Sequence, residues 1–179
     1  MSSVNKLRPI NRCITTHSTS GESILDTTIP TSAIWRHVPE ASFFFAYMTK
    51  TFPVVLKDDA DLENYTDAFA STPKVTVPGG IVLRVMDLGP GISSPMHRTV
   101  SVDYTIVLEG EVELELDSTA IKVMGRGDIC VQRATNHRWT NLSQTEWARM
   151  VLIHIDCENP VVQGIELGES IEGVNVSSD

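Results

Sequence analysis

The 179-residue sequence predicts an all-β fold, a barrel or sandwich built from many antiparallel strands. Two observations lead to this prediction. From about residue 75 onward, short segments alternate between apolar and polar residues, which is the pattern of strands that are buried on one face. Gly, Pro, Asn and Asp interrupt these segments at short intervals, as the turns of an antiparallel sheet require.

The strand-rich part of the chain contains at least five strand candidates. GGIVLRVMDLGPG (79–91) predicts a strand that ends at a Gly-Pro-Gly turn, and VDYTIVLEGEVELELDS (102–118) predicts two strands joined by a Glu-Gly turn. The second of these two alternates Val and Leu with Glu, as a half-solvated strand should. Residues 120–139 and 146–156 supply at least two further strands.

We expect at most one or two short helices. The clear candidate is DDADLENYTDAFA (58–70), in which Leu62, Tyr65 and Phe69 recur on one helical face. Aspartates stand at its start, where a negative charge is favourable toward the helix dipole. The remainder of the leading third contains strand candidates, namely RCITTH, SAIWRH and SFFFAYMT.

The composition indicates one domain. Residues 1–74 are too few for an independent core, so their strands and short helix are expected to extend or cover a barrel formed by residues 75–160. Residues 161–179 read as an acidic C-terminal tail, whose last part, GESIEGVNVSSD, we expect to fray.

Charge and cysteine content restrict the partners and the compartment. The formal net charge of −9 disfavours nucleic acid and anionic membranes as partners. No apolar segment resembles a secretory signal or a membrane span. The three cysteines have no close spacing, which favours free thiols in a reducing compartment. We therefore expect a cytoplasmic protein.

The stretch PGISSPMHRTVSVDYTIVLEGEVELEL (90–116) has a regular spacing of chemically active residues. After Gly91, His97 follows five intervening residues, Thr99 one, Asp103 three and Gly110 six. Residues two apart in a strand share a face, so one continuous strand would point His97, Thr99 and Asp103 in the same direction, together with the serine between the last two. This face would line the barrel interior.

A second motif follows after about fifteen residues. GDICVQRATNHRWTN (127–141) contains His137 and Asn141 at a spacing of four. The two stretches in this order resemble the two motifs of the cupin superfamily, in particular small single-domain cupins of fungal and bacterial small-molecule metabolism. The resemblance covers about residues 79–155 and implies a double-stranded β-helix, the jelly-roll barrel. The first motif departs from the family pattern, because Thr99 replaces a histidine and Asp103 replaces a glutamate.

Carried onto this sequence, the resemblance implies a divalent metal held by His97, Asp103 and His137. Two histidines and a carboxylate can bind Fe, Mn, Zn or Ni. The threonine removes one nitrogen donor, and the shorter aspartate loses roughly 1.5 Å of reach. The alternative is a metal-free polar cluster in which Asp103 orients an imidazole and the histidines act as general acid and base. Both alternatives stay open.

Other residues are candidates for substrate binding. Thr99 and Ser101 could hold a substrate oxygen. Trp139 shares a face with His137, and a core role competes with a pocket role for it. Arg84 points either into the barrel, where it would bind a substrate carboxylate or phenolate, or outward toward a surface acid. His154 stands alone in an apolar strand, so we expect a core or solvent role for it.

The leading functional hypothesis is an enzyme that acts on a small enolisable or phenolic metabolite of secondary metabolism. The chemistry would be decarboxylation, dehydration or isomerisation, with His97, His137 and Asp103 as catalytic residues. The alternatives are an Fe(II)-dependent dioxygenase and a non-catalytic small-molecule-binding protein. We expect a homodimer, with no nucleic acid or membrane partner.

Overall fold

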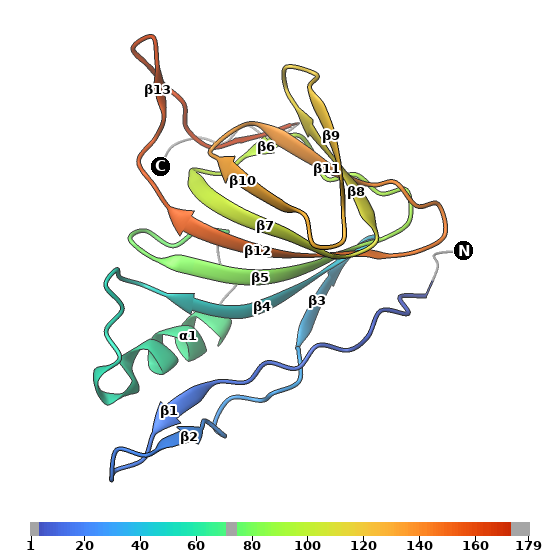
Figure 1. Cartoon of the computed structure of the whole chain (residues 1–179). Helices are drawn as coiled ribbons and strands as arrows, with labels where there is room; N and C mark the ends of the chain where they lie inside the picture. Colours follow the sequence, from blue (N-terminus) through green and yellow to red (C-terminus); the bar gives the residue numbers. More distant parts are fainter. Residues whose placement is uncertain (1–3, 71–74, 173–179) are drawn as a thin grey trace.

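The computed structural model describes residues 4–70 and 75–172 and shows a barrel of two antiparallel sheets (Figure 1). The six-stranded sheet contains, in spatial order, β10 (Ile129–Arg133), β7 (Ser101–Glu109), β12 (Ala148–Asp156), β5 (Ile81–Leu88), β4 (Ala41–Thr49) and β3 (Trp35–Val38). The five-stranded sheet contains β15 (Ser170–Ile171), β6 (His97–Arg98), β11 (His137–Asn141), β8 (Glu111–Leu116) and β9 (Ile121–Gly125). The predicted all-β jelly-roll class is confirmed.

Two short hairpins and one helix complete the described part of the chain. The hairpins pair β1 (Thr15–His17) with β2 (Ser23–Leu25) and β13 (Val161–Val162) with β14 (Ile165–Glu166). The helix α1 (Ala60–Ala70) follows a short 3-10 turn, η1 (Lys57–Asp59), where the sequence predicts a helix. Tyr65 is its buried residue, as the apolar face indicates.

Alternation along the strands places the main core between the two sheets. Val107 and Met150 from the six-stranded sheet pack with Val112, Leu114 and Trp139 from the five-stranded sheet. Because these side chains converge from both sheets, the barrel interior is a packed apolar core at this level and not an open channel. The polar residues of the two sequence motifs lie further along the same inward faces.

The leading third of the chain covers the free edge of β4, as Figure 1 shows for α1. Strand β3 pairs only with residues 41–44 of β4, so the carbonyls beyond Phe44 lack a strand partner on that side. Tyr65 donates its hydroxyl to the Phe45 carbonyl, and Arg12 donates to the Ala46 carbonyl. These bonds satisfy a strand edge that would otherwise be exposed.

A buried ion pair fastens the start of the described chain, residues 4–12, to the outer face of the six-stranded sheet. We call this segment the N-terminal arm. The Arg149 guanidinium donates from Nε and Nη2 to the two Asp87 carboxylate oxygens, at 2.5 and 2.6 Å. Both side chains are almost fully buried. Asn5 donates to Asp87, and Arg149 donates to the Arg8 carbonyl, so the arm is held by both partners. Bidentate pairing of this kind also fixes geometry.

The end of the chain returns to the barrel. In Figure 1 the hairpin that carries β13 projects from the body, after which β15 pairs with β6 beside His97. Glu172 accepts hydrogen bonds from the Met96 amide and from Arg138. The segment expected to fray therefore begins with a strand, because β6 offers a free edge to pair with; residues 173–179 lie outside the described residues.

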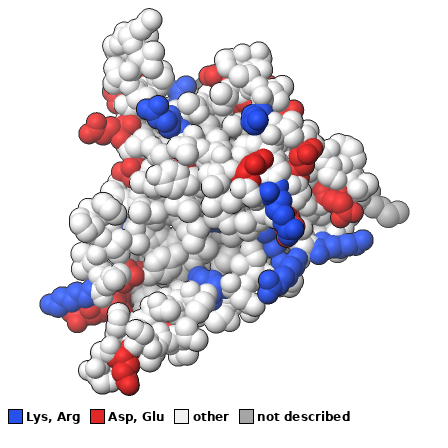
Figure 2. Space-filling model, viewed as in Figure 1, with Lys and Arg blue, Asp and Glu red and all other residues white. Residues whose placement is uncertain are grey.

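The surface carries charges of both signs. On the face in Figure 2, acidic and basic side chains of the described residues are interspersed, with a broad uncharged area between them. On this face several basic side chains gather at the lower right, beside acidic ones, and the other basic side chains are scattered. In the ranges 4–70 and 75–172, no helix is long and apolar enough to cross a membrane.

Candidate functional site

The first motif does not form one continuous strand. His97 lies in β6, Asp103 lies in β7, and a bend at Val100 separates the two strands. Strand β6 belongs to the five-stranded sheet and β7 to the six-stranded sheet, so the chain crosses between sheets here. The motif therefore delivers polar side chains to the interior from both sheets.

The two motif histidines are paired. His97 lies directly opposite His137 in the register of β6 and β11, and their ring centroids are 4.3 Å apart. His97 is half-buried, whereas His137 is only 3% exposed. The sequence spacing identified both residues, and the structure places their rings in contact.

Backbone carbonyls fix the orientation of both rings. His97 Nδ1 lies 2.9 Å from the Pro95 carbonyl oxygen, and His137 Nδ1 lies 2.9 Å from the Thr135 carbonyl oxygen. A carbonyl can only accept, so both Nδ1 atoms carry the proton. Each ring, when neutral, thus keeps a lone pair on Nε2, the atom available for a substrate proton or another ligand.

Burial, reinforced by the charge of His97, lowers the pKa of His137 from 6.5 to about 4. The Thr135 carbonyl and the Asp103 carboxylate oppose this shift but do not overcome it. His137 is therefore a neutral imidazole at pH 7. Its Nε2 lone pair can accept a proton, although the lowered pKa makes it a weaker base than an exposed histidine.

Asp103 orients a histidine, but not one of the motif pair. Its Oδ1 accepts a 2.6 Å hydrogen bond from Ser101 and lies 2.9 Å from Nδ1 of His154. The three side chains are buried, and Asp103 stands opposite His154 in the register of β7 and β12. His154, expected to have only a core or solvent role, thus belongs to the polar cluster. Ser101 is engaged with Asp103 as a donor, and Thr99 is buried at the crossing between the sheets.

The predicted three-residue metal set is not assembled in this arrangement. Within the described ranges, no group of three or more His, Cys, Asp and Glu side chains is placed to hold a metal ion. The Oδ1 atom of Asp103 is engaged with Ser101 and His154, and no hydrogen bond joins Asp103 to His97 or His137 among the described residues. His97, Asp103 and His137 are therefore not arranged to hold a metal ion together, as the predicted ligand set requires.

An open pocket lies next to the histidine pair, but neither histidine is among the residues that line it. Its volume is about 550 Å³, and Leu116, Gln132 and Thr135 belong to its wall. Leu116 pairs with His137 in the register of β8 and β11, and the Thr135 carbonyl holds the His137 ring. The volume lies within the range of about 300–1,000 Å³ that is usual for small-molecule sites.

Trp139 lies deeper in the barrel than this pocket. It is 1% exposed, and its ring meets that of His137 edge-on at 6.2 Å. Its Nε1–H is buried and has no acceptor among the residues that the structure describes. A buried donor without an acceptor is unusual and costs free energy.

Arg84 takes the inward of its two predicted orientations. It pairs in register with Leu152 of β12, a residue of the barrel core, so both side chains leave the sheet on its inner face. Its guanidinium lies over the Phe45 ring at 5.4 Å. Burial, with a contribution from the charge of Arg36, lowers the pKa of Arg84 to about 10. Its role toward a substrate stays a prediction.

The depressed pKa of His137 predicts an acid-sensitive fold. The unfolded imidazole binds a proton below pH 6.5, whereas the folded one does so only below about pH 4. The stabilising contribution is complete above pH 6.5 and is lost as the pH falls from 6.5 to about 4, by on the order of 3 kcal/mol. Urea denaturation at pH 7 and 4.5 measures this loss. In His137→Gln most of that difference should disappear, and an unchanged difference would contradict the assignment.

A jelly-roll barrel with an inward histidine pair is the class of protein that the fold and the site define. No family model matches the sequence. The chain is 43% identical over 163 residues to the oryzines biosynthesis cluster protein J of Aspergillus oryzae, covering 90% of this chain and 91% of that protein. It is 42% identical over 164 residues to the phomopsin biosynthesis cluster protein C' of Diaporthe leptostromiformis, covering 91% and 87%.

The name of a third relative contains the name of a protein family. The cupin-domain-containing oxidoreductase virC of Hypocrea virens is 37% identical over 169 residues, which span 91% of this chain and 84% of the relative. Among solved structures, the polyketide cyclase RemF from Streptomyces resistomycificus superposes with a TM-score of 0.51 at 14% identity, over 86% of this chain and 89% of that one. At this identity the likeness concerns the fold alone. The chain belongs to the cupin superfamily, as its two motifs indicate.

Proposed function

We propose that this cupin is an enzyme of secondary metabolism that moves protons on a small enolisable or phenolic metabolite, without a redox step. The observation that carries the proposal is the histidine pair: two imidazoles in contact, each with Nδ1 committed to a carbonyl and Nε2 directed elsewhere. Such a pair supplies a base and an acid at adjacent positions. The names of two relatives, which refer to the oryzines and phomopsin biosynthesis clusters, support the setting.

We assign the roles of general base and general acid to the two histidines separately. His137 is the general base, because its lowered pKa keeps it neutral and its Nε2 free. We assign the general acid to His97, the less buried ring of the pair. His137 would remove a proton from carbon or oxygen, while His97 would return one from its Nε2 to the departing or newly formed group. Decarboxylation, dehydration and isomerisation all need this exchange.

The remaining residues of the site would orient the substrate and the pair. The adjoining pocket would admit the metabolite; Trp139 is not among its lining residues, so its predicted contact with the substrate requires a ligand that reaches beyond this pocket. Thr99 and Arg84 are further candidates for holding an oxygen or a carboxylate. Asp103 and His154 would act as a buried polar support on the opposite wall of the barrel. They are positioning residues in this scheme.

An oxidoreductase is the second candidate. It rests on the names of relatives, since the one from Hypocrea virens and another from Aspergillus ruber are both called cupin-domain-containing oxidoreductases. The Fe(II) dioxygenase that we consider from the sequence belongs to this class. The contact between Asp103 and His154 favours proton chemistry. Among the described residues, His97, Asp103 and His137 are not placed to hold a metal ion together.

The metabolite that accumulates when the gene is disrupted distinguishes the two candidates. Its mass should differ from that of the normal product by water, by carbon dioxide, or not at all. A difference of two hydrogens or of oxygen atoms would contradict the proposal and support an oxidoreductase. Complementation with His37→Gln, whose histidine lies on β3 outside the barrel cluster, is the matched control for complementation with His137→Gln.

A further inference from the structure

The outer face of the six-stranded sheet is apolar between β10 and β5. Alternation along these strands directs every second residue away from the barrel core. One row of such residues crosses four neighbouring strands, with each member in register with the next, and consists of Val131, Tyr104, Ile153 and Leu83. A sheet face that contacts water normally carries polar side chains at these positions. The row therefore has the composition of a buried face.

The rows on either side of this one have nearly the same composition. One consists of Ile129, Ile106, Val151 and Val85. The other consists of Arg133, Val102, Ile155 and Ile81. We call these three rows of four residues the outer apolar face. Arg133, at its corner, is the one charged residue in the three rows.

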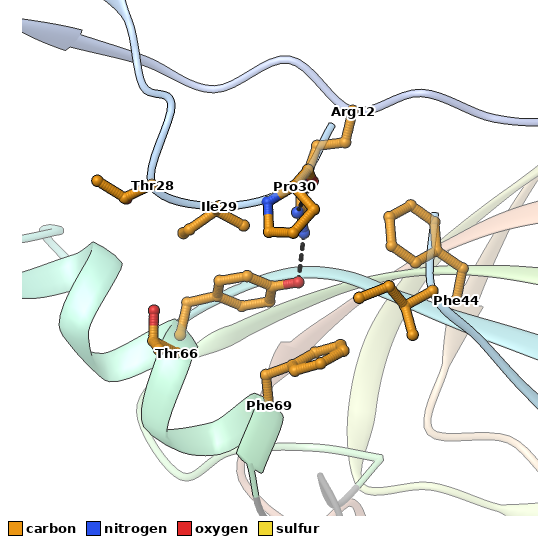
Figure 3. Close-up of a pocket in the computed structure, with 9 residues that line it drawn as sticks. Arg12, Thr28, Ile29, Pro30, Phe44, Thr66 and Phe69 are labelled. Carbon is orange, nitrogen blue, oxygen red and sulfur yellow. Dashed lines mark hydrogen bonds between the residues drawn. The ribbon is translucent and has the colours of Figure 1, made fainter. Parts of the chain in front are cut away.

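The N-terminal arm covers one end of the outer apolar face, beside β4. Ile10 of the arm packs against Val85 and against Phe44, which continues the row of Val85 onto β4. The Arg12 guanidinium carbon lies 5.5 Å from the Phe44 ring centre, in the region that Figure 3 shows. Phe44 and Val85 are accordingly buried. The chain thus treats this end of the face as a core surface.

Toward β10 the same face is open to solvent. Tyr104 is 42% exposed, Val131 is 56% exposed and Ile129 is 65% exposed. Ile153 and Ile155 on the neighbouring strand β12 are partly exposed as well. Each Å² of apolar surface left in water forgoes about 25 cal/mol of stabilisation. Contiguous exposed apolar residues of this kind mark an interaction surface.

We propose that a second copy of this chain covers the outer apolar face, giving a dimer in which β10, β7 and β12 of the two protomers pack face to face. Four strands about 4.8 Å apart and three rows about 6.7 Å apart give the face a footprint on the order of 400 Å². A stable interface buries about 800 Å² on each partner, with an apolar centre and a polar rim. The face supplies such a centre.

The composition of this face fits a second copy better than a different protein. Interfaces between identical subunits are more apolar than other interfaces, whose partners contribute more polar contacts. The chain carries a net charge of −9, so two copies repel each other wherever acidic side chains meet. The three rows contain no acidic residue. Two sheets with apolar faces pack about 10 Å apart with their side chains interdigitated, which a two-fold axis allows here.

Sedimentation velocity on the purified full chain tests the proposal. We expect the parent to be a dimer at micromolar concentration. Tyr104→Glu and Val131→Glu each place a carboxylate in the face at an exposed position, where the core is not disturbed. Each should weaken dimerisation at least ~100-fold, because two unpaired carboxylates would be buried in every dimer. Tyr104→Phe should leave the dimer intact. Val55→Glu should do the same, since Val55 is equally exposed but lies before η1, far along the chain from these strands.

Circular dichroism establishes that each variant is folded, and if one glutamate variant fails to fold, the other decides. A parent that stays monomeric up to ~100 µM would overturn the proposal, because an interface of this size should hold at that concentration. A dimer that persists in both folded glutamate variants would also overturn it, since the contact would then lie elsewhere. Dissociation by Val55→Glu to the same extent would show general charge repulsion and would equally contradict the assigned face.

Discussion

Replacing His137 by Gln should lower turnover of the accumulating metabolite by about 10²–10⁴-fold, the usual contribution of a general base. Gln offers an amide in place of the imidazole but cannot take a proton at neutral pH. Because His137 is expected to act in the transition state, kcat should fall with little change in KM. Steady-state kinetics on the purified protein measure both.

The neighbouring histidines provide the controls for this result. His37→Gln should retain parental activity, because His37 lies on β3, outside the histidine site. Its ring is hydrogen-bonded to the Ser42 hydroxyl. His154→Gln should lower activity less than His137→Gln, because His154 acts through Asp103 and not on the substrate. Activity in His137→Gln within a factor of about three of the parent would contradict the assignment of the base.

Replacing Arg149 by Met should cost about 3–5 kcal/mol of folding free energy. The change leaves the Asp87 carboxylate buried, with the Asn5 side-chain amide as its remaining hydrogen-bond donor among the described residues, and an uncompensated buried charge is strongly destabilising. The contact of Arg149 with the Arg8 carbonyl is lost as well, so the N-terminal arm should loosen. Urea denaturation at pH 7 measures the change.

The double variant Asp87→Leu, Arg149→Met isolates the cause. Because it removes both charges, it should recover most of the stability that the single variant loses. A single variant that loses less than about 1 kcal/mol would show that water reaches the pair. A double variant no more stable than the single one would show that packing, and not charge, dominates.

The sequence was sufficient for the fold class and for the histidine pair. Alternating strands and turn residues predict the barrel, and the spacing of two motifs identifies His97 and His137, which the structure places in contact. Asn141 of the second motif is also accounted for: its side-chain amide donates to the Leu88 and Gly89 carbonyls, so it holds a turn and does not face the site.

The partner of Asp103 could not be predicted from local pattern. His154 pairs with Asp103 only because β12 lies beside β7 in a particular register, and the two residues are 51 positions apart in the chain. The alternation of Met150, Leu152 and His154 in β12 was the available signal, since it puts the histidine on the same face as two core residues. The bend at Val100 was equally hidden, because an alternating sequence does not mark where a strand changes sheets.

The most direct measurement is turnover of the accumulating metabolite by chelator-treated protein in the absence of dioxygen. The proposed proton exchange between His97 and His137 predicts an unchanged rate and the same product, with activity lost in His137→Gln under both conditions. Turnover that stops without dioxygen, or that returns only with added iron, would contradict a non-redox reaction and assign the protein to the oxidoreductases.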